Sequence, residues 1–351
     1  ETDPSQTIRT QITPRDYSTM KKIVSLAMAS IITIAALTYA LWDVDFNELG
    51  QLLSSGDYRV LMPVLVLLVL FYWMKALRWA YILRPIRHFS RAEVTPAMVI
   101  GFAGNNILPA HLGELIRTVI FARRFKLPYS SVAITLLVER VFDLVAILSL
   151  YAVGMAMIGK PPASLQIGTH LITLLMIGFF ATIAVILYRP SLVLGVGNWL
   201  AARLPETLGK RLVGVLENVI LAFSSLKSPL LVTLMLIWSL LKWAIMTGMI
   251  WLSLATYGTY VAPEITLVLL AVLALAAAVP NAPGYIGAMQ AAYVFALRPF
   301  GISEEIAFAA SVMYLVCQWL PVTLAGAWYF IAGGMHVDEV RHEIEVVEET
   351  K

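Results

Sequence analysis

The sequence predicts an all-α polytopic membrane protein, with six full transmembrane helices and two re-entrant helical hairpins in an inverted-topology repeat. Three observations support this fold class. The 351 residues are 60% hydrophobic and 13% charged, and a soluble domain of this size cannot bury so much apolar surface. Several apolar stretches exceed the roughly 20 residues that a helix needs to cross the hydrocarbon core. Two more are interrupted in the middle by asparagine, proline and glycine.

Six stretches have the length and composition of full spans. They cover residues 22–42, 59–83, 128–158, 167–188, 229–257 and 304–333. The first has basic flanks, but its apolar part is too long for the h-region of a signal peptide, so we expect it to remain as a span. Polar tails are expected at residues 1–21 and 334–351. The single cysteine, Cys317, excludes an intramolecular disulfide framework.

The interrupted stretches, 94–122 and 263–300, are each expected to form two short helices that meet at a non-helical tip, because proline removes a backbone donor and glycine weakens a helix. The first tip contains Asn105, Asn106, Pro109 and Gly113, and the second contains Asn281, Pro283, Gly284 and Gly287. Non-helical backbone at membrane depth persists only where protein or a water-filled cavity satisfies it. Both tips are therefore predicted to be functional.

The basic residues predict the orientation in the membrane. They precede the first span, whereas the loop at 43–58 is acidic, so the amino terminus is predicted to be cytoplasmic. Arginines flank the first interrupted stretch on both sides, at 84–91 and 123–124. Both flanks lie inside only if this stretch turns back within the membrane. The protein is then expected in the cell membrane with both termini in the cytoplasm.

The same orientation places the insert at 189–228 in the cytoplasm. Apolar residues recur at helical spacing from 208 to 226, which predicts an amphipathic helix lying in the inner interface. A soluble connector packed on the helix bundle would have the same pattern, so both interpretations stay open.

The order span, span, hairpin, span occurs twice, in residues 22–158 and 159–333, and the two copies start on opposite sides of the membrane. The spacing from Pro109 to Gly113 recurs from Pro283 to Gly287. Interrupted helices at corresponding positions of inverted repeats are the best sequence indication of a transport site. Two helix breaks without common origin are the alternative.

Eight ionisable side chains are predicted to lie within the membrane, where a charge costs about 2.5–3.5 kcal/mol and so indicates function. The cations are Lys75, Arg78, Arg117, Arg140 and Lys242, and the anions are Glu114, Glu139 and Asp143. Five against three leaves a formal surplus of two positive charges. This surplus favours an anionic ligand such as a phosphate headgroup.

Spacing predicts how some of these charges pair. Glu114 and Arg117 are three residues apart on a helix and are expected to pair, beside backbone N–H groups at the tip that could bind an anion. An ion pair that only pins the hairpin is the alternative. Glu139 and Asp143 share a helix face and need a cation between them, either Arg78 or Arg117. Lys75, near the end of its span, is expected to extend toward the interface.

Three ordered motifs resemble the lysylphosphatidylglycerol synthase transmembrane-region family, which includes the flippase half of the multiple peptide resistance factor. They are Asn-Ile-Leu-Pro-Ala-His-Leu-Gly-Glu-Leu-Ile-Arg at 106–117, Glu-Arg-Val-Phe-Asp at 139–143 and Pro-Gly-Tyr-Ile-Gly at 283–287. The resemblance covers residues 22–333. It implies lipid translocation, with the arginines and carboxylates of these motifs lining a cavity between the hairpins. Where the family usually has an acidic residue after the second-hairpin glycines, this sequence has Gln290.

The predicted function is a lipid flippase or scramblase, in which a basic cavity between the hairpins neutralises a phosphate headgroup. The predicted substrate-binding residues are Arg78, Asn105, Asn106, Pro109, Gly113, Glu114, Arg117, Glu139, Arg140, Asp143, Lys242, Asn281, Pro283, Gly284, Gly287 and Gln290. The membrane lipid is the expected partner. We expect no metal, cofactor or nucleic acid, and a homodimer is left open.

Two other functions remain. A membrane-embedded enzyme or accessory subunit of lipid-linked glycan assembly would use Glu114, Glu139 or Asp143 as general base. The nearby arginines make each carboxylate a poor base near neutral pH, so a transporter is favoured. A scaffold with a purely structural charge network is the third interpretation.

Overall fold

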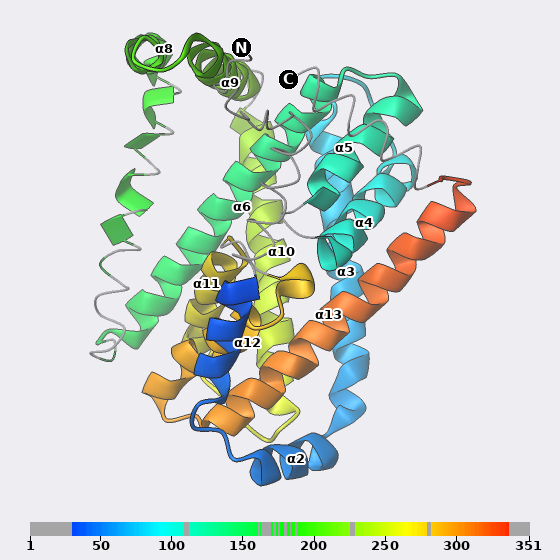
Figure 1. The fold of residues 1–351 in the computed structure, drawn as a ribbon, viewed down its shortest axis with the longest axis vertical. Coiled ribbons are helices and arrows are strands. Elements are labelled where there is room, and N and C mark those ends of the chain that lie inside the picture. The colour runs from blue at the N-terminus through cyan, green and yellow to red at the C-terminus, as the bar shows by residue number, and fades with distance from the viewer. Residues whose placement is uncertain are drawn as a thin grey trace, which may run out of the picture.

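The computed structural model of the chain describes residues 30–108, 112–160, 188–224, 229–278 and 282–336, with a few short pieces between 162 and 186. Within these residues the chain is helical and contains no β-strand. Figure 1 shows the long helices crossing an elongated bundle, with α8 and α9 at one end and α2 at the other. This all-helical architecture agrees with the predicted fold class.

Four helices are long and apolar enough to cross a membrane. They are Tyr58–Ile82, which joins η1 (Tyr58–Val60) to α3 (Leu61–Ile82), then α6 (Tyr129–Ile158), Leu230–Ala255 within α10 (Pro229–Ala255), and α13 (Glu304–Ala332). They agree with four of the six predicted spans. The described part of the first predicted span forms the helix Ser30–Leu41, and most of the fourth, 167–188, lies outside the described residues.

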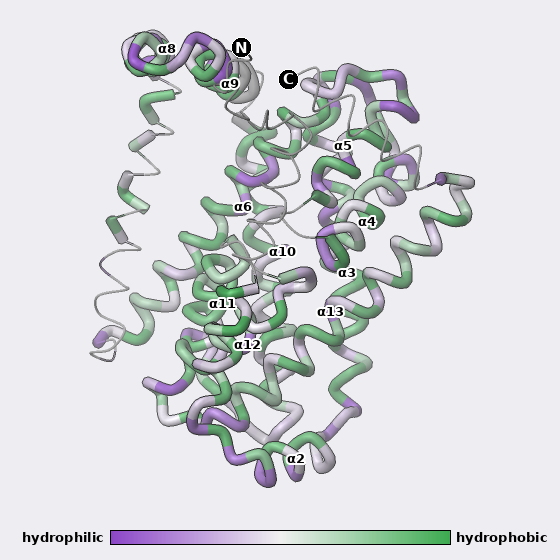
Figure 2. Tube along the Cα trace, in the orientation of Figure 1, coloured by the Kyte–Doolittle hydropathy of each residue, from purple (hydrophilic) through white to green (hydrophobic). Residues whose placement is uncertain are grey.

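The outer faces of the long helices are apolar and exposed. The exposed residues recur at helical spacing: Met62, Val66, Val69 and Trp73 on α3, and Leu320, Leu324, Trp328 and Ile331 on α13. Soluble proteins rarely expose such rows, so these faces are suited to lipid. Figure 2 shows hydrophobic residues along the long helices and hydrophilic ones gathered around α2 and at the end near α5. The protein is an integral membrane protein with several spanning helices.

The first interrupted stretch is a helical hairpin of α4 (Arg91–Ile107) and α5 (Leu112–Phe125). The Ser90 hydroxyl accepts from the Glu93 N–H while the Glu93 carboxylate accepts from the Ser90 N–H, so a capping box starts α4. The Phe89 and Phe125 rings, 4.8 Å apart, bring the two outer ends of the hairpin together. Both ends therefore lie on the same side of the hairpin tip, as predicted.

Glycines allow the two helices of this hairpin to touch. A Cβ at Gly101 would lie 2.6 Å from the Arg117 Cβ, and a Cβ at Gly104 would lie 3.0 Å from the Gly113 Cα. A Cβ at Gly113 would collide with the Gly101 carbonyl oxygen. This backbone contact explains the three glycines of the first interrupted stretch as packing residues.

The second interrupted stretch contains α11 (Pro263–Ala278), η2 (Pro283–Tyr285) and α12 (Ala288–Leu297). Gly284 and Gly287 have φ of 75° and 84°, a left-handed conformation that only glycine adopts without strain. The Gly287 N–H donates to the Gln290 Oε1 at 2.7 Å. The chain therefore turns at the glycines, and Gln290 caps the helix that follows.

The hairpins pack reciprocally against the long helices. Helix α13 packs along α4, α6 packs along α11, and α3 and α10 pack on each other. The two tips also meet, because η2 contacts α4 and a Cβ at Gly284 would lie 3.4 Å from the Asn106 carbonyl oxygen. The arrangement brings the middle of the first half of the chain against the middle of the second.

The connecting segments contain helices that the sequence analysis missed. They are α2 (Phe46–Ser55) after the first helix and α8 (Pro190–Ala201) in the insert, where α8 precedes α9 (Glu206–Ser224). Helix α9 corresponds to the predicted amphipathic helix. It packs on α8, where a Cβ at Gly209 would lie 2.7 Å from the Ala201 carbonyl oxygen.

Candidate functional site

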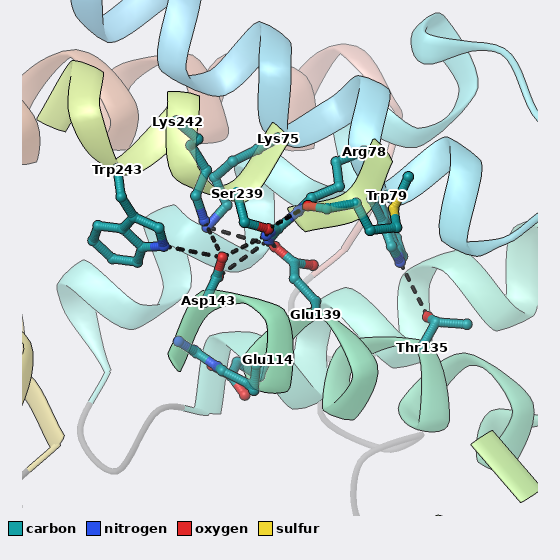
Figure 3. A network of polar contacts seen from close by, with 12 residues as sticks. Lys75, Arg78, Trp79, Glu114, Thr135, Glu139, Asp143, Ser239, Lys242 and Trp243 are labelled. Carbon is teal, nitrogen blue, oxygen red and sulfur yellow. Dashed lines mark hydrogen bonds and ion pairs between the residues drawn. The ribbon is translucent and has the colours of Figure 1, made fainter. Parts of the chain in front are cut away.

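A buried ionic cluster joins α3, α5, α6 and α10. We define it by six charged residues: Lys75, Arg78, Arg117, Glu139, Asp143 and Lys242. Each is at most 6% exposed. Figure 3 shows Lys75, Arg78, Glu139, Asp143 and Lys242 converging between the helices.

Arg78 lies at the centre of this cluster. Its Nη1 donates to the Asp143 Oδ1 at 2.5 Å and to the Ser239 Oγ at 2.6 Å. Its Nη2 donates to the Glu139 Oε1 at 3.0 Å and to the Asp143 Oδ2 at 3.1 Å. The predicted cation between the two carboxylates is therefore Arg78, and its planar fork suits this bridging position.

The second half of the chain contributes through α10. Lys242 Nζ donates to the Asp143 Oδ1 at 2.5 Å, and Trp243 Nε1 donates to the same oxygen at 3.1 Å. Lys242 was predicted from the sequence as a site residue, whereas Ser239 and Trp243 were not. All three lie on one face of a helix at positions i, i+3 and i+4, a spacing that could have revealed them.

Arg117 pairs differently from the prediction. Its Nη2 donates to the Glu139 Oε2 at 2.9 Å, and its guanidinium carbon lies 3.7 Å from the centre of the Trp79 ring. Glu114 instead pairs with Arg140. The predicted Glu114–Arg117 pair is wrong because α5 turns Arg117 toward α3 and α6. The Glu114–Arg140 pair forms outside the buried cluster, and its side chains are 34% and 52% exposed, respectively.

Lys75 also departs from the prediction. It is buried, its Nζ lies 3.7 Å from the Glu139 Oε1 and 3.9 Å from the centre of the Phe102 ring. The α4–α5 hairpin covers this part of α3, so Lys75 contacts the cluster and does not extend toward the interface.

The cluster carries an excess of positive charge. With all six groups ionised, its four cations face two carboxylates, a formal surplus of two positive charges. Three buried polar atoms lack a hydrogen-bond partner among the described residues: Arg78 Nε, Arg117 Nε and Asn105 Oδ1. Two of these atoms, the Nε groups of Arg78 and Arg117, are hydrogen-bond donors of the cluster itself.

Asn106 joins the tip of the first hairpin to α13. Its Nδ2 donates to the Thr323 Oγ1 at 3.0 Å, and its backbone oxygen accepts from the Trp319 Nε1 at 3.1 Å. Gly284 packs against the same tryptophan. Pro109 and Asn281, two other predicted tip residues, lie outside the described residues. The structure brings Asn106 and Gly284 together, as the matched motifs led us to expect.

Two hollows lie near these residues. A cavity of about 150 Å³ between the hairpin tips is lined by residues of α3, α4, α10, α11, η2, α12 and α13, and none of its lining residues in the described part is charged. The expected basic cavity between the hairpins is thus not observed there, because the cations are drawn into the cluster by Glu139 and Asp143. A larger recess of about 600 Å³ between α4, α5 and the end of α13 includes Arg123 and Arg124 in its lining.

Comparison with known proteins adds the family. A model of the lysylphosphatidylglycerol synthase transmembrane region matches residues 23–326. A curated relative, Glycosyltransferase AglD of Haloferax volcanii, is 30% identical over 158 residues, which are 44% of this chain and 25% of that protein. The match thus spans a quarter of the relative's length. The family match covers both hairpins and every member of the ionic cluster, and the chain therefore belongs to the lysylphosphatidylglycerol synthase transmembrane-region family.

Proposed function

We propose that the protein is a lipid translocase, a flippase or scramblase that moves a lipid with an anionic phosphate headgroup across the membrane. The observation that carries this proposal is the formal surplus of two positive charges in the buried ionic cluster. Uncompensated buried charge is costly, and a cluster built only for stability would balance its charges. A phosphate passing beside Arg78 and Arg117 would supply the missing charge.

In this proposal the two hairpins are re-entrant and the two halves of the chain form an inverted repeat. The reciprocal packing of α13 on α4 and of α6 on α11 supports this arrangement, as does the contact between the tips. The end that carries α8, α9 and the outer ends of α4 and α5 faces the cytoplasm, and the protein resides in the cell membrane with both termini inside. Inverted repeats with broken helices typically bind substrate where the repeats meet.

The half-exposed pair of Glu114 and Arg140 gives the headgroup a first contact. An incoming phosphate would compete with the Glu114 carboxylate for the Arg140 guanidinium, which binds phosphate in the same bidentate manner. Arg140 follows Glu139 directly in α6, so a phosphate bound there lies beside the cluster. Arg123 and Arg124, in the recess at the predicted cytoplasmic end, offer a basic approach from that side.

Reconstitution into liposomes with tail-labelled anionic lipids tests the proposal. Wild-type protein should accelerate transbilayer movement, and Arg117→Gln and Arg140→Gln should each reduce the rate by about tenfold or more, since a hydrogen bond to a charged group contributes about 1.5–3 kcal/mol. Arg203→Gln is the matched control, because Arg203 is exposed and its side chain contacts the neighbouring Trp199, far from the cluster in sequence. Size-exclusion profiles establish that each variant is folded.

Lipid movement that is equal in wild type, Arg117→Gln and protein-free liposomes would refute the translocase. Movement that depends on protein but is insensitive to both arginine substitutions would refute the role of the cluster. A new covalent lipid product would support an enzyme instead.

The second candidate is an enzyme or accessory subunit of lipid-linked glycan assembly, and the similarity to a glycosyltransferase favours it. The geometry of the carboxylates is against a catalytic base. Asp143 Oδ1 accepts from Arg78, Lys242 and Trp243, and the two Glu139 oxygens contact Arg78, Lys75 and Arg117. With every oxygen occupied by a donor, neither carboxylate is placed to take a proton from a substrate.

A further inference from the structure

The cavity between the hairpin tips differs in chemistry from the ionic cluster next to it. It measures about 150 Å³. Five aromatic side chains line it, together with two amides and several aliphatic residues: Tyr72, Trp243, Tyr285, Tyr314 and Trp319, with Asn106 and Gln318. Its lining in the described part of the chain is uncharged.

Trp243 lies between the cavity and the cluster. Its side chain lines the cavity, while its Nε1 donates to the Asp143 Oδ1 at 3.1 Å. Figure 3 shows the indole beside Asp143 at the edge of the charged group. A ligand in the cavity is thus one tryptophan ring away from the surplus positive charge.

The amides of the lining keep acceptors available. Gln318 donates through Nε2 to the Tyr314 Oη at 3.0 Å, and Asn106 donates through Nδ2 to Thr323. Neither side-chain carbonyl oxygen accepts a hydrogen bond from another described residue. Aromatic faces with a few placed polar groups are the usual lining of a small-ligand site.

Size and charge select among ligands. A cavity of about 150 Å³ accommodates one benzene-sized ring, which is smaller than a lipid with its chains. An ammonium group would be attracted by the aromatic faces, but the neighbouring cluster, with two more cations than anions, would repel it through a low-dielectric interior. An aliphatic chain would leave the two amide acceptors without donors. A small neutral group with hydroxyl donors fits the volume, avoids repulsion by the cluster and donates hydrogen bonds to the two amide oxygens.

We propose that this cavity binds the hydroxylated, uncharged part of the transported headgroup, a polyol or sugar about one ring in size, while the phosphate bonded to it lies at the edge of the cavity beside Trp243, on the side of the ionic cluster. This inference rests on the proposed function and adds the substrate class to it. Hydroxyl groups donate to Gln318 and Asn106, and the C–H face of the polyol lies on the aromatic rings.

The test compares tail-labelled lipids in the same reconstituted liposomes. Phosphatidylinositol and phosphatidylglycerol carry a polyol on the phosphate, phosphatidic acid carries none, and phosphatidylcholine carries an ammonium group. Wild-type protein should move the two polyol lipids roughly three- to tenfold faster than phosphatidic acid, the ratio expected from one or two neutral hydrogen bonds. Phosphatidylcholine should be the slowest.

Two variants probe the cavity itself. Gln318→Leu removes the amide at nearly constant volume, and Ala274→Leu fills part of the cavity, since Ala274 lines it. Each should bring the rate ratio of polyol lipid to phosphatidic acid close to one. The control is Val316→Leu on the outer face of α13, the helix that carries Gln318. Val316 is 52% exposed, and this variant should keep the wild-type ratio.

The outcomes separate this inference from the proposed function. Equal movement of phosphatidic acid and the polyol lipids overturns the cavity assignment and leaves the translocase standing. So does a preference for phosphatidylcholine, or a polyol preference that survives both Gln318→Leu and Ala274→Leu in folded protein. Failure to move any lipid overturns the translocase and this inference together.

Discussion

The two hairpins occupy comparable places in the fold but differ in chemistry. The α4–α5 hairpin carries Glu114 and Arg117, and Arg117 reaches the buried Glu139. The stretch from 263 to 300 has charged residues only near its outer ends, Glu264 and Arg298. Its buried polar residues are uncharged: Thr266 hydrogen-bonds the Pro263 carbonyl oxygen, and Gln290 hydrogen-bonds the backbone of its own turn.

This difference teaches that the fold does not require the charges. Both hairpins contain closely packed glycines, and the described parts of the two tips contact each other, yet only the α4–α5 hairpin brings ionisable groups into the interior. Since the uncharged hairpin shows that the architecture can be built without them, the cluster is better explained by a ligand than by stability. One hairpin then contributes to the phosphate site, and the other contributes a neutral wall.

The largest expected effect comes from the centre of the cluster. Arg78→Gln leaves Glu139 and Asp143 buried without their shared cation, and removal of one partner from a buried ionic group costs about 3–5 kcal/mol. Thermal unfolding of the purified variant should show a large loss of stability. Gln318→Leu in the second half should cost about 1 kcal/mol, and equal losses for the two variants would contradict the contrast between the halves.

A smaller effect is expected at the crossing of α4 and α5. Gly113→Ala forces a methyl group into the Gly101 carbonyl oxygen, and overpacking of this kind costs about 1–3 kcal/mol. Gly50→Ala is the control, because a Cβ at Gly50 meets no atom within 4 Å. Equal unfolding temperatures for the two variants would show that the hairpin is not held by this contact.

The corresponding device in the second hairpin is a single hydrogen bond. Gln290→Ala removes the acceptor of the buried Gly287 N–H and should destabilise the protein by about 1 kcal/mol. Gln290→Glu keeps an acceptor at the same place and should lose less. If alanine is tolerated as well as glutamate, the cap contributes nothing and the side chain has another role.

The smallest effect is expected at the half-exposed pair of Glu114 and Arg140. A double-mutant cycle with Glu114→Gln and Arg140→Gln should give a coupling of about 0.2–1 kcal/mol in stability, as for other solvent-exposed ion pairs. The same cycle on Arg117 and Glu139 should give a clearly larger value. Similar couplings would remove the distinction between an inner cluster and an outer, exchangeable pair.

Local sequence patterns predicted the spans and the breaks because both depend on the chain itself. Apolar length predicted four helices that the structure contains, and proline and glycine located the breaks between α4 and α5 and between α11 and α12. Partner choice in the cluster depends on how the helices are rotated against one another. Spacing alone therefore paired Glu114 with Arg117, whereas tertiary packing pairs Arg117 with Glu139.

Other features were missed for similar reasons. Lys75 was expected to reach the interface because the sequence of its own helix does not reveal that the α4–α5 hairpin covers it. Ser239 and Trp243 were not predicted as site residues because they are uncharged, although they share one helix face with Lys242. Helices α2 and α8 lie in segments between the predicted spans. They are too short to be recognised by the apolar length that marks a span.

The central claim is that the surplus positive charge of the cluster is kept for an anionic guest. Thermal unfolding of the solubilised protein with added short-chain lipid tests it most directly, because a ligand that binds the native state raises its stability. A short-chain phosphatidylglycerol should raise the unfolding temperature of wild type and of Arg203→Gln, but much less that of Arg117→Gln, and short-chain phosphatidylcholine should have little effect. Equal stabilisation of wild type and Arg117→Gln by the anionic lipid would contradict the claim.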